Sequence, residues 1–309
     1  MDSYIEYYFI NNDIPCSERL DITEEEALKC QQKYKVFSRK LEIENIFDVF
    51  VEEFKSFKSI LSQAQLSQEF SNYSEAFAYI ENQKIRTKLN VSYLSILNTG
   101  KLLLDRLYND SSGFSIINDI DKSVIINFKE SREDIFKNNQ NYVFGCNLRN
   151  LCQHKLLPIN KLTLKYPQKV NSEISLVTRF FLSLTLSSMK RDDRKFILQK
   201  LDPVFKDKMK KIDQVDLNRI IDGYYEGIFD LIKTFRMLVK GAVKSSEEYF
   251  ERLVEKITGG NIALRPPALC ISNQHKFYLD FEWFKVAHYL EEKNNLYFKS
   301  ANLIRTQYI

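Results

Sequence analysis

Apolar residues recur at intervals of three and four positions over much of this sequence, which is the spacing that forms one apolar face on an α-helix. The spacing predicts helices over residues 23–38, 41–66, 74–109, 213–241 and 245–258. The first helix begins at Thr23, a capping residue followed by three glutamates that suit the positive end of the helix dipole. Gly100, inside a predicted helix, is expected to mark the close approach of another helix. Only 8 glycines and 6 prolines interrupt the 309 residues, so the fold is predicted to be mainly α.

The middle of the chain carries mixed patterns. Residues 110–132 are predicted as a loop followed by a short irregular or extended piece. Residues 133–156 are predicted as a helix that ends before Pro158, because the residue before a proline avoids the α region. Two runs rich in β-branched and aromatic residues lie within 158–187, which predicts a pair of strands. The charged stretch 189–211 is predicted as a helix or a linker.

Both ends of the chain carry short runs typical of strands, at residues 4–10 and 276–281. The glycine- and proline-rich segment 259–268 is the clearest breaker between helices and tail. These features predict an N-terminal helical extension over 1–70, a helical domain over 71–258 with a β insertion near 158–187, and a C-terminal tail over 259–309 packed on that domain.

Composition narrows the classes of function only slightly. The 45 basic residues nearly balance 41 acidic ones, and the net charge of +4 permits nucleic-acid binding without arguing for it. The 5 cysteines include no C-x-x-C pair, which disfavours a disulfide framework or zinc site and favours a reducing, cytoplasmic location. No secretory signal or membrane span is recognised. No metal or cofactor is expected.

Candidate chemistry lies in residues 141–159, NYVFGCNLRNLCQHKLLPI. On a helix with 100° between residues, the apolar residues of this segment share one arc. The polar residues share the opposite arc: Arg149, Asn150, Gln153 and His154. Asn150 and His154 are four apart and therefore neighbours on the surface. One face would anchor the helix, while the other presents a cation, an amide and an imidazole.

Those three groups are the ones that RNA cleavage needs. A neutral imidazole can take the proton of the 2′-hydroxyl that attacks phosphorus, and an imidazolium can protonate the leaving oxygen. A guanidinium suits a phosphate whose charge grows in the transition state. DNA would not be cleaved by this reaction, because it lacks the 2′-hydroxyl.

The pattern R-N-x-x-x-H at a helix end resembles the signature of the HEPN superfamily, R-x(4–6)-H with a polar residue often after the arginine. The upstream run LNVSYLSILNTGKLLLDRLY resembles the companion helix of such proteins, with Asp105 near its end. The resemblance covers residues 85–160. It implies a helical bundle, a homodimer that joins two copies of the motif, and metal-independent endoribonuclease activity, often in toxins or phage defence.

Carried over by position, the resemblance makes Arg149, Asn150 and His154 the catalytic set. Asp105, Gln153 and Lys155 are candidate supporting residues. The products would carry 2′,3′-cyclic phosphate and 5′-hydroxyl ends. The strand pair after the motif departs from the plainest bundle, so a small β-hairpin insertion is expected there. An antitoxin or another defence-system protein is an expected partner beside RNA.

A non-catalytic interpretation stays open: a HEPN-like helical interaction or RNA-binding module. In that case His154 is only a histidine at a helix end that interacts with the helix dipole. Tyr93 and Tyr142 are interpreted as core residues rather than platforms for bases. The basic cluster within 190–211 could follow a phosphate backbone, but its interspersed aspartates favour a solvated helix.

Overall fold

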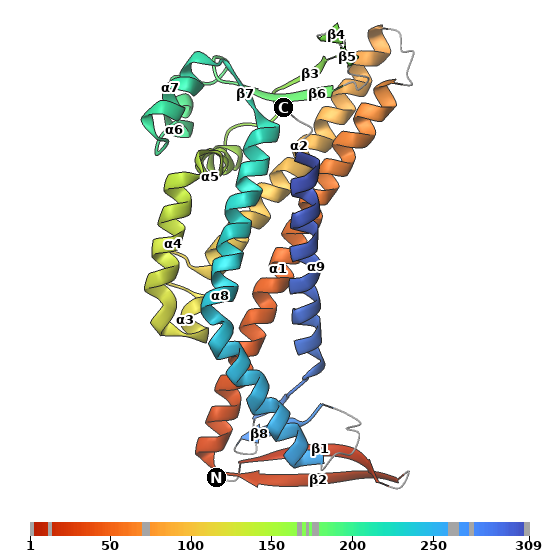
Figure 1. The fold of residues 1–309 in the computed structure, drawn as a ribbon, viewed down its shortest axis with the longest axis vertical. Coiled ribbons are helices and arrows are strands. Elements are labelled where there is room, and N and C mark those ends of the chain that lie inside the picture. Colours follow the sequence, from red (N-terminus) through yellow and green to blue (C-terminus); the bar gives the residue numbers. More distant parts are fainter. Residues whose placement is uncertain are drawn as a thin grey trace. The chain divides into compact units, whose positions relative to one another are not determined.

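The computed structural model describes residues 3–11, 14–69, 75–165, 169–170, 173–174, 179–258, 266–271 and 275–305. This part of the chain is mainly helical with small antiparallel sheets, which confirms the expected class (Figure 1). The helices are α1 (Glu24–Glu69), α2 (Glu75–Leu107), α3 (Ile116–Ile120), the 3-10 turn η1 (Lys122–Val124), α4 (Ile125–Asn138), α5 (Gln140–Cys152), α6 (Arg191–Ile197), α7 (Pro203–Lys211), α8 (Leu217–Thr258) and α9 (Glu282–Arg305).

Two predicted helix breaks are absent. Helix α1 runs through the expected gap at residues 39–40, and α8 runs through the expected gap at 242–244. The first gap holds Arg39 and Lys40, both good helix formers. Near the second, a lone glycine costs only about 1 kcal/mol in a helix, which packing along α8 outweighs. The start at Thr23 is confirmed: its hydroxyl accepts from the Glu26 backbone N–H at 3.1 Å, while its own N–H donates to the Glu26 carboxylate at 2.9 Å.

The region from 110 to 156 differs from prediction at two places. Residues 125–132 belong to α4 and are not an irregular piece, because Phe128 is fully buried and anchors that helix. The single helix expected over 133–156 breaks at Asn139. The Asn139 side chain accepts from the Tyr142 backbone N–H at 2.9 Å and donates to the Gly223 carbonyl at 2.9 Å. Asn139 therefore caps a new helix, α5.

The strand pair after α5 is confirmed. Strands β3 (Lys161–Lys165) and β6 (Arg179–Thr185) pair antiparallel from Lys161 opposite Ser183 to Lys165 opposite Arg179. A third strand, β7 (Gln214–Asp216), extends this sheet in the order β3-β6-β7. The helix predicted over 213–241 was wrong at these residues, because α8 begins only at Leu217 and three residues are too few for a strand pattern of their own. Two further short strands, β4 (Lys169–Val170) and β5 (Glu173–Ile174), pair with each other. The charged stretch 189–211 forms the helices α6 and α7.

A second antiparallel sheet joins the two ends of the chain in the order β2-β1-β8-β9. Its strands are β1 (Ser3–Asn11), β2 (Ile14–Ile22), β8 (Ala268–Ile271) and β9 (His275–Tyr278). The predictions at residues 4–10 and 276–281 find β1 and most of β9. Ile5, Tyr7 and Phe9 alternate into a core with Phe250 and Leu269. Strand β2 was missed because most of it is exposed and polar. The predicted breaker at 259–268 lies largely outside the described residues.

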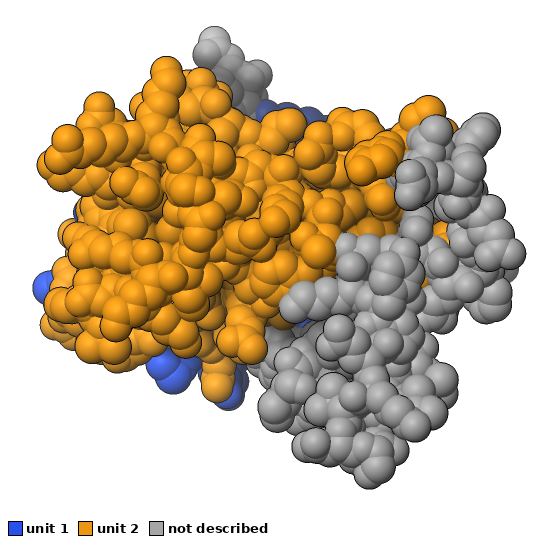
Figure 2. Space-filling model, turned by 90° about the horizontal axis from the view of Figure 1, so that it is seen from above, with its two compact units in different colours: residues 1–48, 106–126, 235–309 blue, residues 49–105, 127–234 orange. Residues whose placement is uncertain are grey.

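The chain divides into two compact units, coloured separately in Figure 2. Unit 1 comprises residues 1–48, 106–126 and 235–309, and unit 2 comprises 49–105 and 127–234. These units do not coincide with the three consecutive regions expected from the sequence, because α1 and α8 each contribute residues to both. Among the helices described, none is long and apolar enough to cross a membrane.

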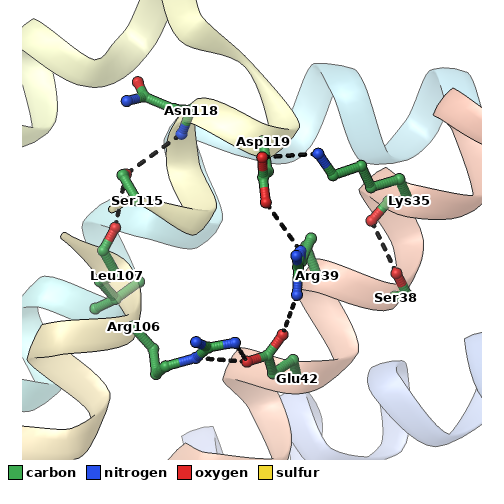
Figure 3. A network of polar contacts seen from close by, with 9 residues as sticks. All are labelled: Lys35, Ser38, Arg39, Glu42, Arg106, Leu107, Ser115, Asn118 and Asp119. Carbon is green, nitrogen blue, oxygen red and sulfur yellow. Dashed lines mark hydrogen bonds and ion pairs between the residues drawn. The ribbon is translucent and has the colours of Figure 1, made fainter. Parts of the chain in front are cut away.

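Within unit 1, a polar network ties α3 to α1 (Figure 3). The carboxylate of Asp119 accepts from Lys35 Nζ at 2.7 Å and from Arg39 Nε at 3.0 Å. Arg39 also pairs with Glu42 at 2.8 Å, and Glu42 in turn pairs with Arg106 at the end of α2. Burial alone would raise the pKa of Asp119, but the two cations outweigh it and lower the pKa.

Candidate functional site

Helix α5 carries the motif and is anchored through the buried ring of Tyr224 in α8. A Cβ atom on Gly145 of α5 would lie 2.7 Å from Cδ2 of this ring, and one on Gly100 of α2 would lie 2.6 Å from its hydroxyl oxygen. Only glycine permits such approach. The expectation that Gly100 marks a close contact with another helix is therefore confirmed, and the contact brings α2 and α5 to the same side chain.

Both tyrosines considered for base stacking belong to the core. Tyr93 and Tyr142 are buried, and the ring of Tyr142 stacks on Tyr224 with centroids 5.8 Å apart. The Tyr93 hydroxyl donates to the Leu217 carbonyl at 3.2 Å. The interpretation of these residues as core is confirmed.

The two faces predicted for the motif helix are present. The apolar face is buried through Phe144, Leu148 and Leu151. On the other side, Asn150, Gln153, His154 and Lys155 are exposed and Arg149 is half-buried. The helix itself ends at Cys152, so His154 lies in the turn that follows and not in the helix. There the His154 N–H donates to the Leu151 carbonyl at 3.2 Å, as does the Lys155 N–H at 2.9 Å.

Arg149 contacts the next residue of its own helix. Its Nη1 donates to Asn150 Oδ1 at 3.3 Å, and its Nε is buried without a hydrogen-bond partner among the described residues. Burial raises the pKa of the neighbouring Cys146 thiol to about 12, while Arg149 is among the cations that oppose this rise. The structure thus joins Arg149 to Asn150. No hydrogen bond within the described part of the chain joins either of them to the imidazole of His154.

Asp105, a candidate supporting residue, is engaged within its own helix. It forms an ion pair with Lys101 one helical turn before it in α2. Burial raises the pKa of Tyr224 well above its usual value; the Arg149 charge lowers it and the Asp105 charge raises it. Both charges therefore act on the same hydroxyl. Within the described residues, the ion pair of Asp105 is with Lys101, and no hydrogen bond joins it to Arg149, Asn150 or His154.

A pocket of about 560 Å³ opens beside the turn that carries the motif. Its walls come from α2, from the segment 155–160 and from residues 184–193. Three cationic side chains line it, namely Arg86, Lys155 and Lys190. Lys155 Nζ donates to Asp193 Oδ1 at 2.5 Å, and that carboxylate is almost fully buried. The candidate supporting residue Lys155 is therefore ion-paired, while its side chain stays 54% exposed at the wall of the pocket.

Asparagines fix the segments around this pocket. Asn90 of α2 donates to the Ile159 carbonyl at 3.0 Å and accepts from the Ile159 N–H at 2.8 Å. Asn147 of α5 donates to the Ile197 and Gln199 carbonyls at 3.1 and 2.8 Å, which ties the end of α6 to the motif helix. The sequence did not identify either asparagine as a residue that positions the site. Their only signal was an amide on the buried side of an amphipathic helix, where an unpaired polar group is costly.

The arrangement offers a phosphodiester two kinds of contact. Arg149 and Lys190 supply positive charge, and the exposed imidazole of His154 supplies ring nitrogens that can accept or donate a proton. Within the described ranges, no group of three His, Cys, Asp or Glu side chains gathers as metal ligands would.

The chain was compared with protein-family models, with curated proteins and with solved structures, and none of the three comparisons finds a match.

Proposed function

We propose that this protein is a metal-independent endoribonuclease of the HEPN type. The observation that carries the proposal is the division of the motif helix into two faces. One face is buried in unit 2, while the other face and the turn after it present the guanidinium of Arg149, the amide of Asn150 and the imidazole of His154.

His154 is the proton-transfer group in this proposal. Its ring is exposed and has no hydrogen bond or ion pair within the described residues, so it is open to a substrate hydroxyl. As a neutral base it takes the proton of the 2′-hydroxyl, whose oxygen then attacks the adjacent phosphorus. Protonation of the departing 5′-oxygen completes the step and leaves a 2′,3′-cyclic phosphate.

Arg149 stabilises the charge that grows on the non-bridging phosphate oxygens. Its buried Nε lacks a partner, and its Nη1 makes one long contact with Asn150. A phosphate would satisfy the guanidinium better than Asn150 does, because charge-assisted hydrogen bonds are shorter and stronger. Asn150 keeps the guanidinium in position until the substrate arrives.

A homodimer completes the proposed site. A single copy offers one imidazole at the motif, whereas the reaction uses a base and an acid. Two copies with their motif turns facing one cleft would supply both. An equal mixture of wild-type and His154→Ala chains should then cut at roughly a quarter of the wild-type rate and not at half, because only dimers with two histidines hold both the base and the acid.

The direct test is cleavage of a labelled single-stranded RNA panel in EDTA by the wild type, Arg149→Ala and His154→Ala. The wild type should cut and leave cyclic-phosphate ends, and both variants should lose at least about 100-fold in rate. His288→Ala is the matched control, since it removes another exposed histidine, one paired with Glu247 in unit 1. Equal cutting by all four proteins would refute the assignment of the motif.

One observation favours a second function, an RNA-binding module without catalysis. Arg149 is bonded to Asn150 and not to His154. If RNA binds to the wild type and is never cut, and if Arg149→Ala weakens that binding while His154→Ala does not, the module is the correct interpretation.

A further inference from the structure

A groove lies in unit 1, and the residues that line it are far from the motif in the sequence. It has a volume of about 590 Å³ and lies between α8 and α9. Its floor is aromatic: Phe250 is buried, with Phe281 and Phe284 at centroid distances of 5.0 and 5.8 Å from it. Phe281 and Phe284 are only partly buried. The groove therefore offers apolar surface to an occupant.

The walls of this groove are acidic. Four glutamates line it, together with one lysine and one histidine. These two side chains already have partners: His288 contacts Glu247 at 2.8 Å, and Lys285 pairs with Glu282 at 2.8 Å. Glu251 and Glu255 have no ion pair within the part of the chain that the structure describes. Two uncompensated negative charges thus border an aromatic floor, in a chain whose net charge is +4.

Glu247, Glu251 and Glu255 are spaced four residues apart along α8 and project in one row. Like charges at this spacing destabilise a helix by a few tenths of a kcal/mol per pair. A neutral residue at Glu251 or Glu255 would make a more stable isolated helix. The presence of this row of glutamates is explained if a positively charged binding partner compensates the repulsion between them.

We propose that this groove binds a cationic amphipathic helix of a partner protein. The apolar face of that helix would lie on Phe250, Phe281 and Phe284, as in other helix-in-groove complexes. Its lysine or arginine side chains, one turn apart, would face Glu251 and Glu255. The inference is independent of the proposed ribonuclease activity, because no motif residue takes part.

The test uses the full chain and a synthetic 14-residue leucine–lysine helix that contains no aromatic residue. The only tryptophan, Trp283, is exposed and stands between two residues that line the groove. Its emission should therefore change on binding. Affinity is measured separately, from the anisotropy of fluorescein on the peptide, and we expect a Kd of about 10 μM in low salt that weakens as salt is added.

The groove variant is Glu251→Lys with Glu255→Lys, and it should weaken binding at least about ten-fold. The matched control is Glu130→Lys with Glu133→Lys, which reverses the same number of charges on exposed positions of α4 that have no ion pair among the described residues. The control should change the Kd by less than about two-fold. Equal weakening by both variants would overturn the proposal, since it would reflect net charge alone.

Two further measurements distinguish the proposed partner helix from other occupants of the groove. A serine–lysine peptide of equal charge should bind at least about ten-fold more weakly, because it lacks the apolar face; equal binding would overturn the groove assignment. Sedimentation should give the same mass for wild type and groove variant. A lower mass for the variant would show that a second copy of this chain fills the groove, and would overturn the partner helix.

Discussion

The hydroxyl oxygen of Tyr224 lies 2.6 Å from the position that a Cβ atom on Gly100 would take. The same hydroxyl donates to the Leu97 carbonyl at 3.2 Å, and the other side of the ring meets Gly145. Tyr224 thus lies between two helices that depend on its position. One of them, α5, carries Arg149 and Asn150 and leads into the turn with His154, so the contact links the packing of unit 2 to the site.

Gly100→Ala should therefore destabilise the protein by about 2 kcal/mol or more, as measured by urea unfolding. The new methyl group cannot be accommodated, because Gly145 blocks retreat of the ring. Gly241→Ala is the matched control in α8. That glycine is exposed with no atom within 4 Å of the added Cβ, so alanine should stabilise the helix by about 0.5–1 kcal/mol. A Gly100→Ala protein as stable as the wild type would contradict this packing.

Asn90→Ala should cost about 2–4 kcal/mol and loosen the segment after the motif. The substitution leaves the N–H and the carbonyl of the buried residue Ile159 without partners, and each orphaned group carries a desolvation penalty. Hydrogen exchange of the Ile159 amide reports the change directly, and it should become faster by more than global destabilisation explains. Asn98→Ala, at an exposed position of the same helix, is the comparison and should leave that amide unchanged.

The sequence predicted the structure correctly where a residue pattern repeats. It did not predict contacts between residues that are far apart in the chain. The buried and exposed faces of α5 follow from spacing alone, and so they were predicted correctly. The bond from Lys155 to Asp193 joins residues 38 positions apart, and the bond from Asn90 to Ile159 joins residues 69 apart. No local pattern encodes such partners. The end of α5 at Cys152 was also misjudged, because Pro158 limits a helix without fixing its last residue.

The buried ion pair of Arg236 and Glu44 in unit 1 gives a further prediction. Arg236 Nε and Nη2 donate to the two Glu44 carboxylate oxygens at 2.9 and 2.6 Å, and the side chains are only 8% and 0% exposed. Arg236→Met should cost about 3–5 kcal/mol, because it leaves a buried carboxylate unpaired.

Adding Glu44→Leu to Arg236→Met should restore most of that loss, since an apolar pair of similar size replaces the ion pair. Denaturant unfolding of both single variants and the double variant forms a complete cycle. A double variant whose loss equals the sum of the single losses would show that the two side chains are not coupled.

Asp119 makes the stability of unit 1 depend on pH in a predictable direction. Burial opposes ionisation, but Lys35 and Arg39 outweigh it, so the pKa of this carboxyl is lower in the folded chain than in the unfolded chain. A lowered pKa means that the unfolded state binds the proton more readily. The stabilisation is therefore complete above the unfolded pKa of about 3.9 and is lost as the pH falls through the folded value.

Asp119→Asn should consequently lower the free energy of unfolding by about 1 kcal/mol at pH 7, a modest figure because Lys35 is half exposed and screened by solvent. The difference from wild type should shrink as urea titrations are repeated at lower pH, and it should approach zero near pH 2. Asp134→Asn, at an exposed position of α4 with no ion pair among the described residues, should show no such convergence. A deficit in Asp119→Asn that stays constant down to pH 2 would mean that shape at this position matters more than the ionised carboxylate, and the network in Figure 3 would then be a steric contact with little electrostatic content.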